Sequence, residues 1–227
     1  MKKIVFLISI MGLLWASCQQ NQELIPYQLI PYRKGDKWGF CTPDKKMVVQ
    51  PKYDDAWSFS EGLAWVKLNG KWGFIDTTGK EIVTPKYDND MAEYFHEGLA
   101  RVKLNGKYGF IDKTGKEIVT PKYDDASSFQ EGLARVKLNG KWGFIDTTGK
   151  EIVTPKYDDA DDFKEGLAKV ELNGKVGFID TTGKEIVTPK YDYALYFSEG
   201  LAGVKLNGKY FYIKIFPDSK VVEYYEE

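Results

Sequence analysis

The sequence predicts an all-β protein, a tandem array of six three-stranded antiparallel meanders stacked as an open, superhelical, solenoid-like structure. Two observations predict this fold. A Lys-aromatic-Gly tripeptide recurs at intervals of 34 residues, or 36 once, and alternating apolar and polar runs separated by Asn-Gly and Asp-x-x-Gly turns surround each copy. The copies are Lys37-Trp38-Gly39, Lys71-Trp72-Gly73, Lys107-Tyr108-Gly109 and Lys141-Trp142-Gly143, with variants Lys175-Val176-Gly177 and Lys209-Tyr210-Phe211.

The composition is that of a folded protein with balanced charge. Of 227 residues, 43% are apolar and 29% are charged, and the formal net charge is −1. The apolar fraction can form a sizeable core. Because no net positive field attracts phosphate backbones, we expect no nucleic-acid partner. The two cysteines, Cys18 and Cys41, are too few for a disulfide framework.

The first 17 residues predict a signal peptide. Lys2 and Lys3 precede an apolar run over residues 4–15, and two small residues follow it. The run is shorter than the roughly 20 residues that a membrane-spanning helix needs. We therefore expect export, with residues 1–17 removed.

Residues 14–18 resemble the lipobox of bacterial lipoproteins, in which the cysteine is diacylated and becomes the new N-terminus. Trp15 departs from the pattern, since a branched aliphatic residue is usual there. The resemblance implies a lipid anchor on Cys18, and Gln19 in place of aspartate implies an outer-membrane lipoprotein. An ordinary cleaved secretory signal is the alternative. Residues 18–28 form a polar tether that is too poor in apolar residues to fold.

The array occupies residues 29–227, with units that begin near residues 29, 63, 99, 133, 167 and 201. In the second unit, Asn69-Gly70 supplies the two positive φ angles of a type I′ turn, so strands 63–68 and 71–76 pair as a hairpin. This register places Trp65 opposite Phe74, with Ala and Val side chains on one face and aromatic side chains on the other.

The turn Asp76-Thr77-Thr78-Gly79 leads into a third strand over residues 80–84. Pro85 cannot donate to a strand ladder, so we expect the strand to end there. The two residues added in the 88–95 segment indicate a loop between units.

A single meander has apolar side chains on both faces, so neighbouring units must cover it. We expect the glycine of each tripeptide to admit an aromatic side chain from the adjacent unit. Phe211, at the same position in the last copy, would be tolerated because no further unit follows. A closed propeller-like ring is the alternative, and it would require the first and last units to dock.

The unit at residues 61–88 resembles the bacterial WG repeat, also called the KWG repeat. It contains Lys71-Trp72-Gly73, the following Phe-Ile-Asp and the closing Pro-Lys-Tyr-Asp. The resemblance covers residues 29 to about 225. It implies an extracytoplasmic or assembly-type bacterial repeat protein, and the family has no common catalytic residues.

No residue pattern predicts catalysis, a cofactor or a metal site. His96 has no second histidine or cysteine partner, and the acidic runs at 88–90 and 158–162 lack calcium-loop spacing. The carboxylates of Asp76 and its equivalents recur in every unit, as expected of turn residues rather than of a catalytic pair. Cys41 replaces an isoleucine and fits a buried site.

Positions that differ between units are the candidate contact surface, since the repeat does not dictate them. Several of these positions carry aromatic or cationic side chains, which are enriched at interaction hot spots. Exposed positions also vary without function. The candidate binding surface consists of Trp57, Trp65, Tyr94, Arg101, Arg135, Lys169 and Tyr196.

The sequence thus predicts a non-catalytic repeat lipoprotein that binds or scaffolds an unknown protein or glycan partner at the bacterial cell envelope. A glycan-binding module is the alternative. It would require Trp57, Trp65 and Trp72 to be exposed in one row.

Overall fold

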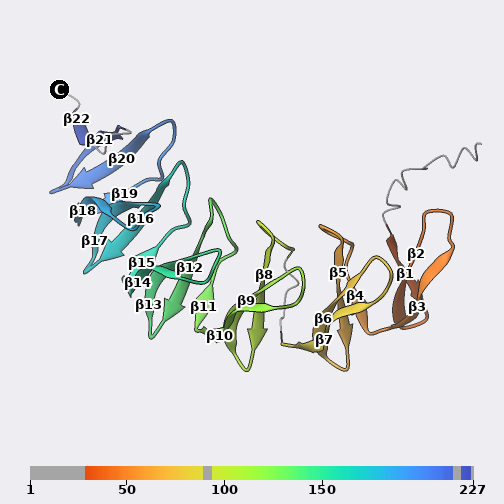
Figure 1. Cartoon of the computed structure of the whole chain (residues 1–227). Helices are drawn as coiled ribbons and strands as arrows, with labels where there is room; N and C mark the ends of the chain where they lie inside the picture. The colour runs from red at the N-terminus through yellow and green to blue at the C-terminus, as the bar shows by residue number, and fades with distance from the viewer. Residues whose placement is uncertain (1–28, 89–93, 217–220, 226–227) are drawn as a thin grey trace, which may run out of the picture.

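The computed structural model describes residues 29–88, 94–216 and 221–225. These residues form six small antiparallel sheets of three or four strands that follow one another along the chain (Figure 1). The array is open and curved, and its first and last units lie at opposite ends of a crescent, so the closed ring is not formed. The described part contains no helix long and apolar enough to cross a membrane. The predicted signal peptide, the tether and Cys18 lie outside the described residues.

Each unit takes its strands in chain order. The first three units contain β1 (Ile30–Lys34), β2 (Lys37–Cys41), β3 (Met47–Tyr53), β4 (Asp55–Ala56), β5 (Leu63–Leu68), β6 (Lys71–Asp76), β7 (Glu81–Tyr87), β8 (Leu99–Leu104), β9 (Lys107–Asp112) and β10 (Glu117–Tyr123). The last three contain β11 (Asp125–Ala126), β12 (Leu133–Leu138), β13 (Lys141–Asp146), β14 (Glu151–Tyr157), β15 (Asp159–Ala160), β16 (Leu167–Leu172), β17 (Lys175–Asp180), β18 (Glu185–Tyr191), β19 (Tyr193–Ala194), β20 (Leu201–Leu206), β21 (Lys209–Ile215) and β22 (Val221–Tyr225).

The hairpins have the predicted register. In the second unit Trp65 pairs with Phe74 and Val66 with Gly73. Asn69 and Gly70 have φ angles of 51° and 78°, as a type I′ turn requires. The Asn-Gly pair therefore sets the register, and the register fixes which side chains share a face.

In the Asp-x-x-Gly turns, the aspartate side chain accepts hydrogen bonds from the backbone of the same turn. In the fourth unit, Oδ1 of Asp146 accepts hydrogen bonds from the N–H groups of Thr148 at 2.9 Å and Lys150 at 3.0 Å. The hydrogen bond from the Thr148 hydroxyl is the main reason that the pKa of Asp146 lies below its ordinary value. Asp76, Asp112 and Asp180 make the same bonds. The prediction that these carboxylates are turn residues is confirmed.

The third strand does not end before the proline, contrary to expectation. Strand β7 continues through Pro85 to Tyr87, which pairs with Trp72, while Val83 pairs with Phe74. Three residues of β7 therefore lie opposite Gly73 as a bulge. Because residues in a bulge leave the ladder, the missing N–H of proline costs no hydrogen bond there.

The bulge also explains the tripeptide glycine, and the expected approach of an aromatic side chain is wrong. A Cβ on Gly143 would lie 2.3 Å from the carbonyl oxygen of Val153 and 2.6 Å from the nitrogen of Pro155. Both atoms belong to the bulged third strand of the same unit. In the last unit, β21 and β22 pair without a bulge, so Phe211 fits and is 3% exposed.

Four of the six sheets have a short additional strand that the sequence did not predict. After the Pro-Lys-Tyr-Asp segment, two residues pair with the first long strand of the next unit, as Ala160 does with Val170. In the third unit the corresponding segment includes residues 89–93, which lie outside the described residues. The connection between units is thus part of the next unit's sheet.

Candidate interaction surface

Each inner unit packs one face against the next unit and the other against the preceding unit. We call the face with Trp142 and Phe144 the forward face and the face with Ala168, Val170 and Ile179 the backward face. These five residues belong to one buried cluster that joins the fourth and fifth units. The same arrangement recurs in the clusters between other units, so units stabilise one another as predicted.

An aromatic ring from the connection completes each interface. Phe163 packs edge-on against Phe144, with ring centroids 4.9 Å apart and planes at 68°. Such edge-to-face pairs contribute beyond their buried area. Trp142 is 8% exposed and Trp72 is 4% exposed, so the tryptophan of the repeat is mainly a packing residue.

A repeated aspartate links the hairpins of consecutive units along the edge that carries the Asn-Gly turns. The carboxylate of Asp158 pairs with Lys141 of the fourth unit and accepts the N–H of Asn173, 2.7 Å away in the fifth unit. The hydrogen bond from Lys141, followed by that from Asn173, lowers the pKa of Asp158. Asp88, Asp124 and Asp192 make equivalent contacts.

A tyrosine, a lysine and a glutamate form a second link between units. The hydroxyl of Tyr157 donates to Oε1 of Glu185 in the next unit at 3.0 Å, and Nζ of Lys156 lies 3.1 Å from the same oxygen. Tyr157 is fully buried, and burial is the main reason that its pKa is raised. The repeated Lys-Tyr and Lys-Glu dipeptides thus serve stacking.

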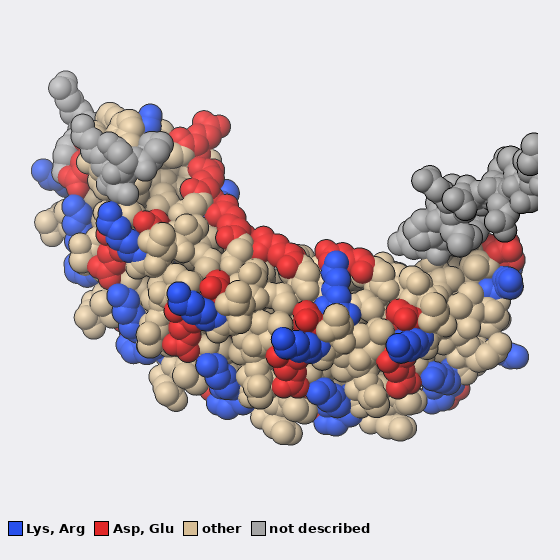
Figure 2. Space-filling view, in the orientation of Figure 1, with Lys and Arg blue, Asp and Glu red and all other residues tan. Residues whose placement is uncertain are grey.

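Glutamates of the Glu-Gly turns form a third link, which we call the Glu ladder. The Glu131 carboxylate accepts the N–H groups of Glu165 and Gly166, each at 2.9 Å, and Glu165 in turn accepts those of Glu199 and Gly200. Figure 2 shows a line of acidic residues along the concave edge, as one such residue per stacked unit would produce.

The predicted binding residues Arg101, Arg135 and Lys169 bridge neighbouring units. Nη1 of Arg135 donates to the Ala160 carbonyl at 2.6 Å, and its guanidinium carbon lies 4.8 Å from the centroid of the Trp142 ring. Arg101 makes the same contacts with the Ala126 carbonyl and the Tyr108 ring, and burial lowers its pKa.

Lys169 occupies the corresponding position in the fifth unit. Its Nζ lies 2.9 Å from Asp161 and 4.7 Å from the ring centroid of Tyr196 in the last unit. These three cations are partly buried and are committed to contacts within the array.

The residue type at the position of Arg101, Arg135 and Lys169 varies with the connection to the next unit. The cations occur where the following connection offers a carbonyl or an aromatic ring. Trp65 precedes the longer connection, is 2% exposed and packs against Trp72 and Phe74. Gly203 lies in the last of the described units.

Trp65 and Trp72 are buried, so the row of three exposed tryptophans that the glycan-binding alternative requires is absent. Of the predicted surface, Trp57, Tyr94 and Tyr196 are exposed, by 36%, 42% and 61%. The rings of Trp57 and Tyr94 lie 6.1 Å apart at 69°. The structure thus brings together an aromatic pair from two units and places Tyr196 in the last unit.

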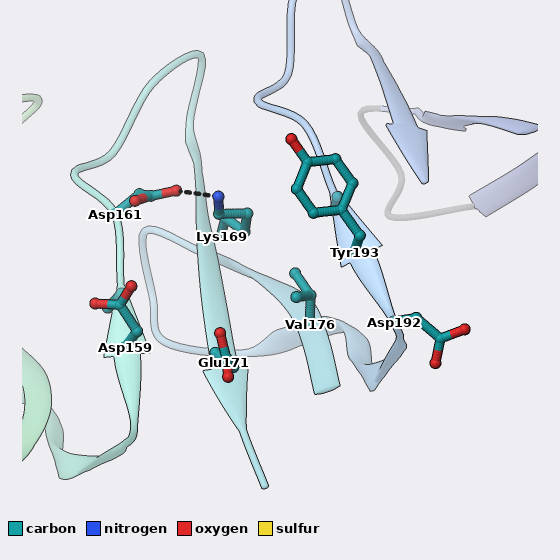
Figure 3. A pocket seen from close by; sticks show the side chains of 9 residues that line it. Asp159, Asp161, Lys169, Glu171, Val176, Asp192 and Tyr193 are labelled. Atoms are coloured by element: carbon teal, nitrogen blue, oxygen red, sulfur yellow. Dashed lines mark ion pairs between the residues drawn. The ribbon is translucent and has the colours of Figure 1, made fainter. Parts of the chain in front are cut away.

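A hollow of about 160 Å³ lies between the fifth and sixth units. Figure 3 shows Asp159, Glu171 and Asp192 around it, together with the ion pair between Asp161 and Lys169. Asp192 also pairs with Lys175. Two of the carboxylates that line the hollow, those of Asp161 and Asp192, therefore already bind lysines of the array.

Ion pairs account for three of the four aspartates in the acidic run at 158–162. Asp158 contacts Lys141, Asp161 contacts Lys169, and Asp162 lies 3.1 Å from Nε of Arg135. Within the described residues, no group of three or more His, Cys, Asp or Glu side chains could hold a metal ion. His96 is exposed, and Cys41 is 2% exposed, as predicted for a buried hydrophobe.

Sequence reasoning missed a group of exposed side chains in the last unit. Tyr193, Leu195, Tyr210, Tyr212 and Tyr224 are 47–67% exposed. The available signal was that Tyr193 and Leu195 replace polar or charged residues of the fourth and fifth units.

The family model for the WG containing repeat matches residues 38–72, 72–108, 108–142, 142–175 and 177–210. The chain belongs to this family. The contacts described above explain the WG-repeat signature in this chain. The tryptophan packs between units, and the glycine leaves room for the bulge of the third strand. The lysine, tyrosine and aspartate of Pro-Lys-Tyr-Asp bond to the next unit.

No curated protein matches the chain. Among solved structures, it is similar to a streptogramin B lyase, at 18% identity over 88% of this chain and 80% of that chain, with a TM-score of 0.36. It is also similar to virginiamycin B lyase from Staphylococcus aureus, at 19% identity over 91% and 86%, with a TM-score of 0.34. For Hsv2p of Kluyveromyces lactis, the identity is 10% over 87% and 80%, with a TM-score of 0.42. At these scores the similarities carry no argument about activity.

Proposed function

We propose that this WG-repeat protein is an exported lipoprotein that binds or scaffolds a partner at the bacterial cell envelope without catalysis. One observation supports binding in particular. The repeated polar side chains serve turns and unit-to-unit contacts, whereas the exposed side chains that vary between units include the aromatic pair Trp57 and Tyr94. An open array presents such side chains over a long surface, as repeat proteins that bind extended partners do.

The anchor in this proposal is a lipid on Cys18, which would place the array at the outer membrane. Incorporation of radiolabelled palmitate tests it directly. Wild type should take up label and the Cys18→Ala variant should not. Absence of label from wild type would remove the lipid anchor, while leaving the binding proposal to be tested separately.

Crosslinking in intact cells tests the partner. A photoreactive amino acid in place of Trp57 should trap a defined species, because this side chain is exposed. The matched control places the same amino acid at Trp65, which is buried, and should trap nothing from outside the chain. Equal products from both positions would contradict the proposed surface.

The exposed row of three tryptophans expected for glycan binding is absent, but a smaller aromatic site, the Trp57 and Tyr94 pair, keeps a glycan as the second candidate partner. Aromatic rings combine apolar faces with polar edges, so the pair could stack on a sugar ring. Polysaccharide titration should quench the fluorescence of wild type but not that of Trp57→Phe. Unchanged fluorescence across a glycan panel would eliminate this candidate.

A further inference from the structure

The last unit carries an unusual share of the exposed apolar surface. Of the twelve large hydrophobic side chains exposed among the described residues, seven lie between residues 193 and 224. Large exposed apolar patches on soluble proteins mark interaction sites more often than scattered residues do. This end of the array is therefore a candidate interface distinct from the pair formed by Trp57 and Tyr94.

Strand register places five of these side chains on one face. Tyr193 pairs with Lys205, which pairs with Tyr210. Tyr212 pairs with Tyr224 on one side and Gly203 on the other, and Leu195 lies against Gly203. Phe211 and Ile213 point the opposite way, into the core shared with the fifth unit. The terminal aromatic face, as we call it, consists of Tyr193, Leu195, Tyr210, Tyr212 and Tyr224.

This face is the forward face, which preceding units bury against their successor. Phe178 occupies the position of Tyr212 and is 1% exposed, whereas Tyr212 is 51% exposed. Val176 occupies the position of Tyr210, and the two are 8% and 67% exposed. Terminal units of repeat arrays normally have a polar outer face, which keeps them soluble. Here tyrosines and a leucine occupy it instead.

The substitutions at the edge strand reinforce this point. Tyr193 and Leu195 stand where the fifth unit has Asp159 and Asp161. Gly203 stands where the second to fifth units have a large side chain, and a hollow of about 160 Å³ lined by the face lies beside it. The surface thus gains apolar side chains and a recess, both of which favour docking of a protein surface.

The first unit presents the complementary half of the same interface. Ile30 and Tyr32 lie on its backward face, at the positions of Ala64 and Val66 in the second unit. Ile30 is 44% exposed and Tyr32 is 37% exposed, whereas Ala64 and Val66 are at most 1% exposed. One end of the described array therefore exposes a forward face and the other end a backward face, and these faces pack against each other at every junction inside the array.

We propose that the terminal aromatic face binds the first unit of a second copy of this chain, so that copies associate head to tail and extend the array. The contact is heterologous, since it joins two different surfaces, and the curvature of the array decides whether it closes or continues. This inference goes beyond the proposed function and requires neither the lipid anchor nor a binding partner.

Sedimentation velocity on residues 18–227 carrying Cys18→Ala, which lack both the lipid and the apolar signal peptide, tests the proposal. The average mass should rise above that of one chain as the concentration approaches about 100 μM, the range expected of a modest interface. Tyr212→Lys and Ile30→Lys should each weaken association at least about tenfold, because each introduces a charge at the centre of the contact. Thr120→Lys, which adds the same charge at an exposed position of an inner unit, is the matched control and should associate like the parent chain.

Mixing the two end variants gives the decisive result. Tyr212→Lys retains an intact first unit and Ile30→Lys an intact last unit, so an equimolar mixture should form a dimer and nothing larger. That dimer would also show that both variants are folded. A parent chain that stays monomeric would overturn the proposal. So would self-association retained by Ile30→Lys but lost by Tyr212→Lys, which indicates tail-to-tail pairing.

Discussion

Replacement of Gly143 by alanine tests the physical account of the WG repeat most directly. The added Cβ would lie 2.3 Å from the Val153 carbonyl oxygen and within 3 Å of two backbone atoms of Pro155. None of these atoms belongs to a flexible side chain, so the bulge itself must move. Overpacking of this kind costs about 1–3 kcal/mol, and the reduced entropy of the unfolded chain returns only about 0.4–1 kcal/mol.

We therefore expect Gly143→Ala to lower the free energy of unfolding by about 1–2 kcal/mol. Urea titration followed by circular dichroism measures this difference, provided that several probes unfold together, since long arrays can lose cooperativity. Gly203→Ala is the matched control. Its Cβ would first meet Cδ1 of Leu195 at 3.3 Å, the end of a flexible side chain.

The control should change stability by less than about 0.5 kcal/mol. A Gly143→Ala variant that is as stable as wild type would show that the bulge does not require glycine. A large loss in both variants would show that glycine matters at these positions for a reason other than contact with the third strand.

Further predictions concern the contacts between units. Arg135→Ala should cost about 1–3 kcal/mol of unfolding free energy in urea titration, because it removes the hydrogen bond to the next unit. Arg33→Ala, at an exposed position, is the control and should cost less than about 0.5 kcal/mol. Equal losses in the two variants would contradict the bridging role of Arg135. Tyr157→Phe should cost about 0.5–1.5 kcal/mol, and a neutral result would exclude its hydroxyl as a link. The Asp-to-Asn links depend on carboxylates whose pKa values are lowered by folding. These links contribute their full stability above the unfolded-state pKa of about 3.9 and lose it as the pH falls through the lower folded-state values. Stability should therefore decline below about pH 4. In thermal melts, a difference in melting temperature between wild type and Asp158→Asn that already disappears between about pH 7 and 5 would contradict this account. Acrylamide should quench a larger fraction of the fluorescence in wild type than in Trp57→Phe, because Trp57 is exposed. Trp65→Phe removes a buried ring and should raise the accessible fraction above that of wild type. The reverse order would contradict the assigned exposures.

Local chemistry made much of the fold predictable. The Asn69-Gly70 turn set the hairpin register, and the Asp-x-x-Gly turn set the start of the third strand, since both signals act within a few residues. The two apolar faces then required stacking. The path of the third strand was less predictable, because Pro85 suggested a strand end and only its pairing with β6 reveals the bulge.

The candidate surface was predicted less well because exposure depends on neighbours. Trp65, Arg101 and Arg135 vary between units and so resembled surface residues. The two arginines, however, contact carbonyls of the following unit that lie 25 positions away in the chain. Trp65 packs in the core. Conversely, Tyr210 and Tyr212 occupy positions that are buried or half-buried in other units, and they are exposed because no described unit covers them.

By itself the sequence determined the repeat, the hairpins, their register and the need for units to stack, because turn geometry and strand alternation are local properties of the chain. Only the tertiary structure decided that the array stays open, that the glycine faces its own unit's bulge, that the repeated charges link successive units, and which end exposes tyrosines. Each of these depends on where residues distant in sequence meet, and an almost identical unit can be buried or exposed according to its place in the array.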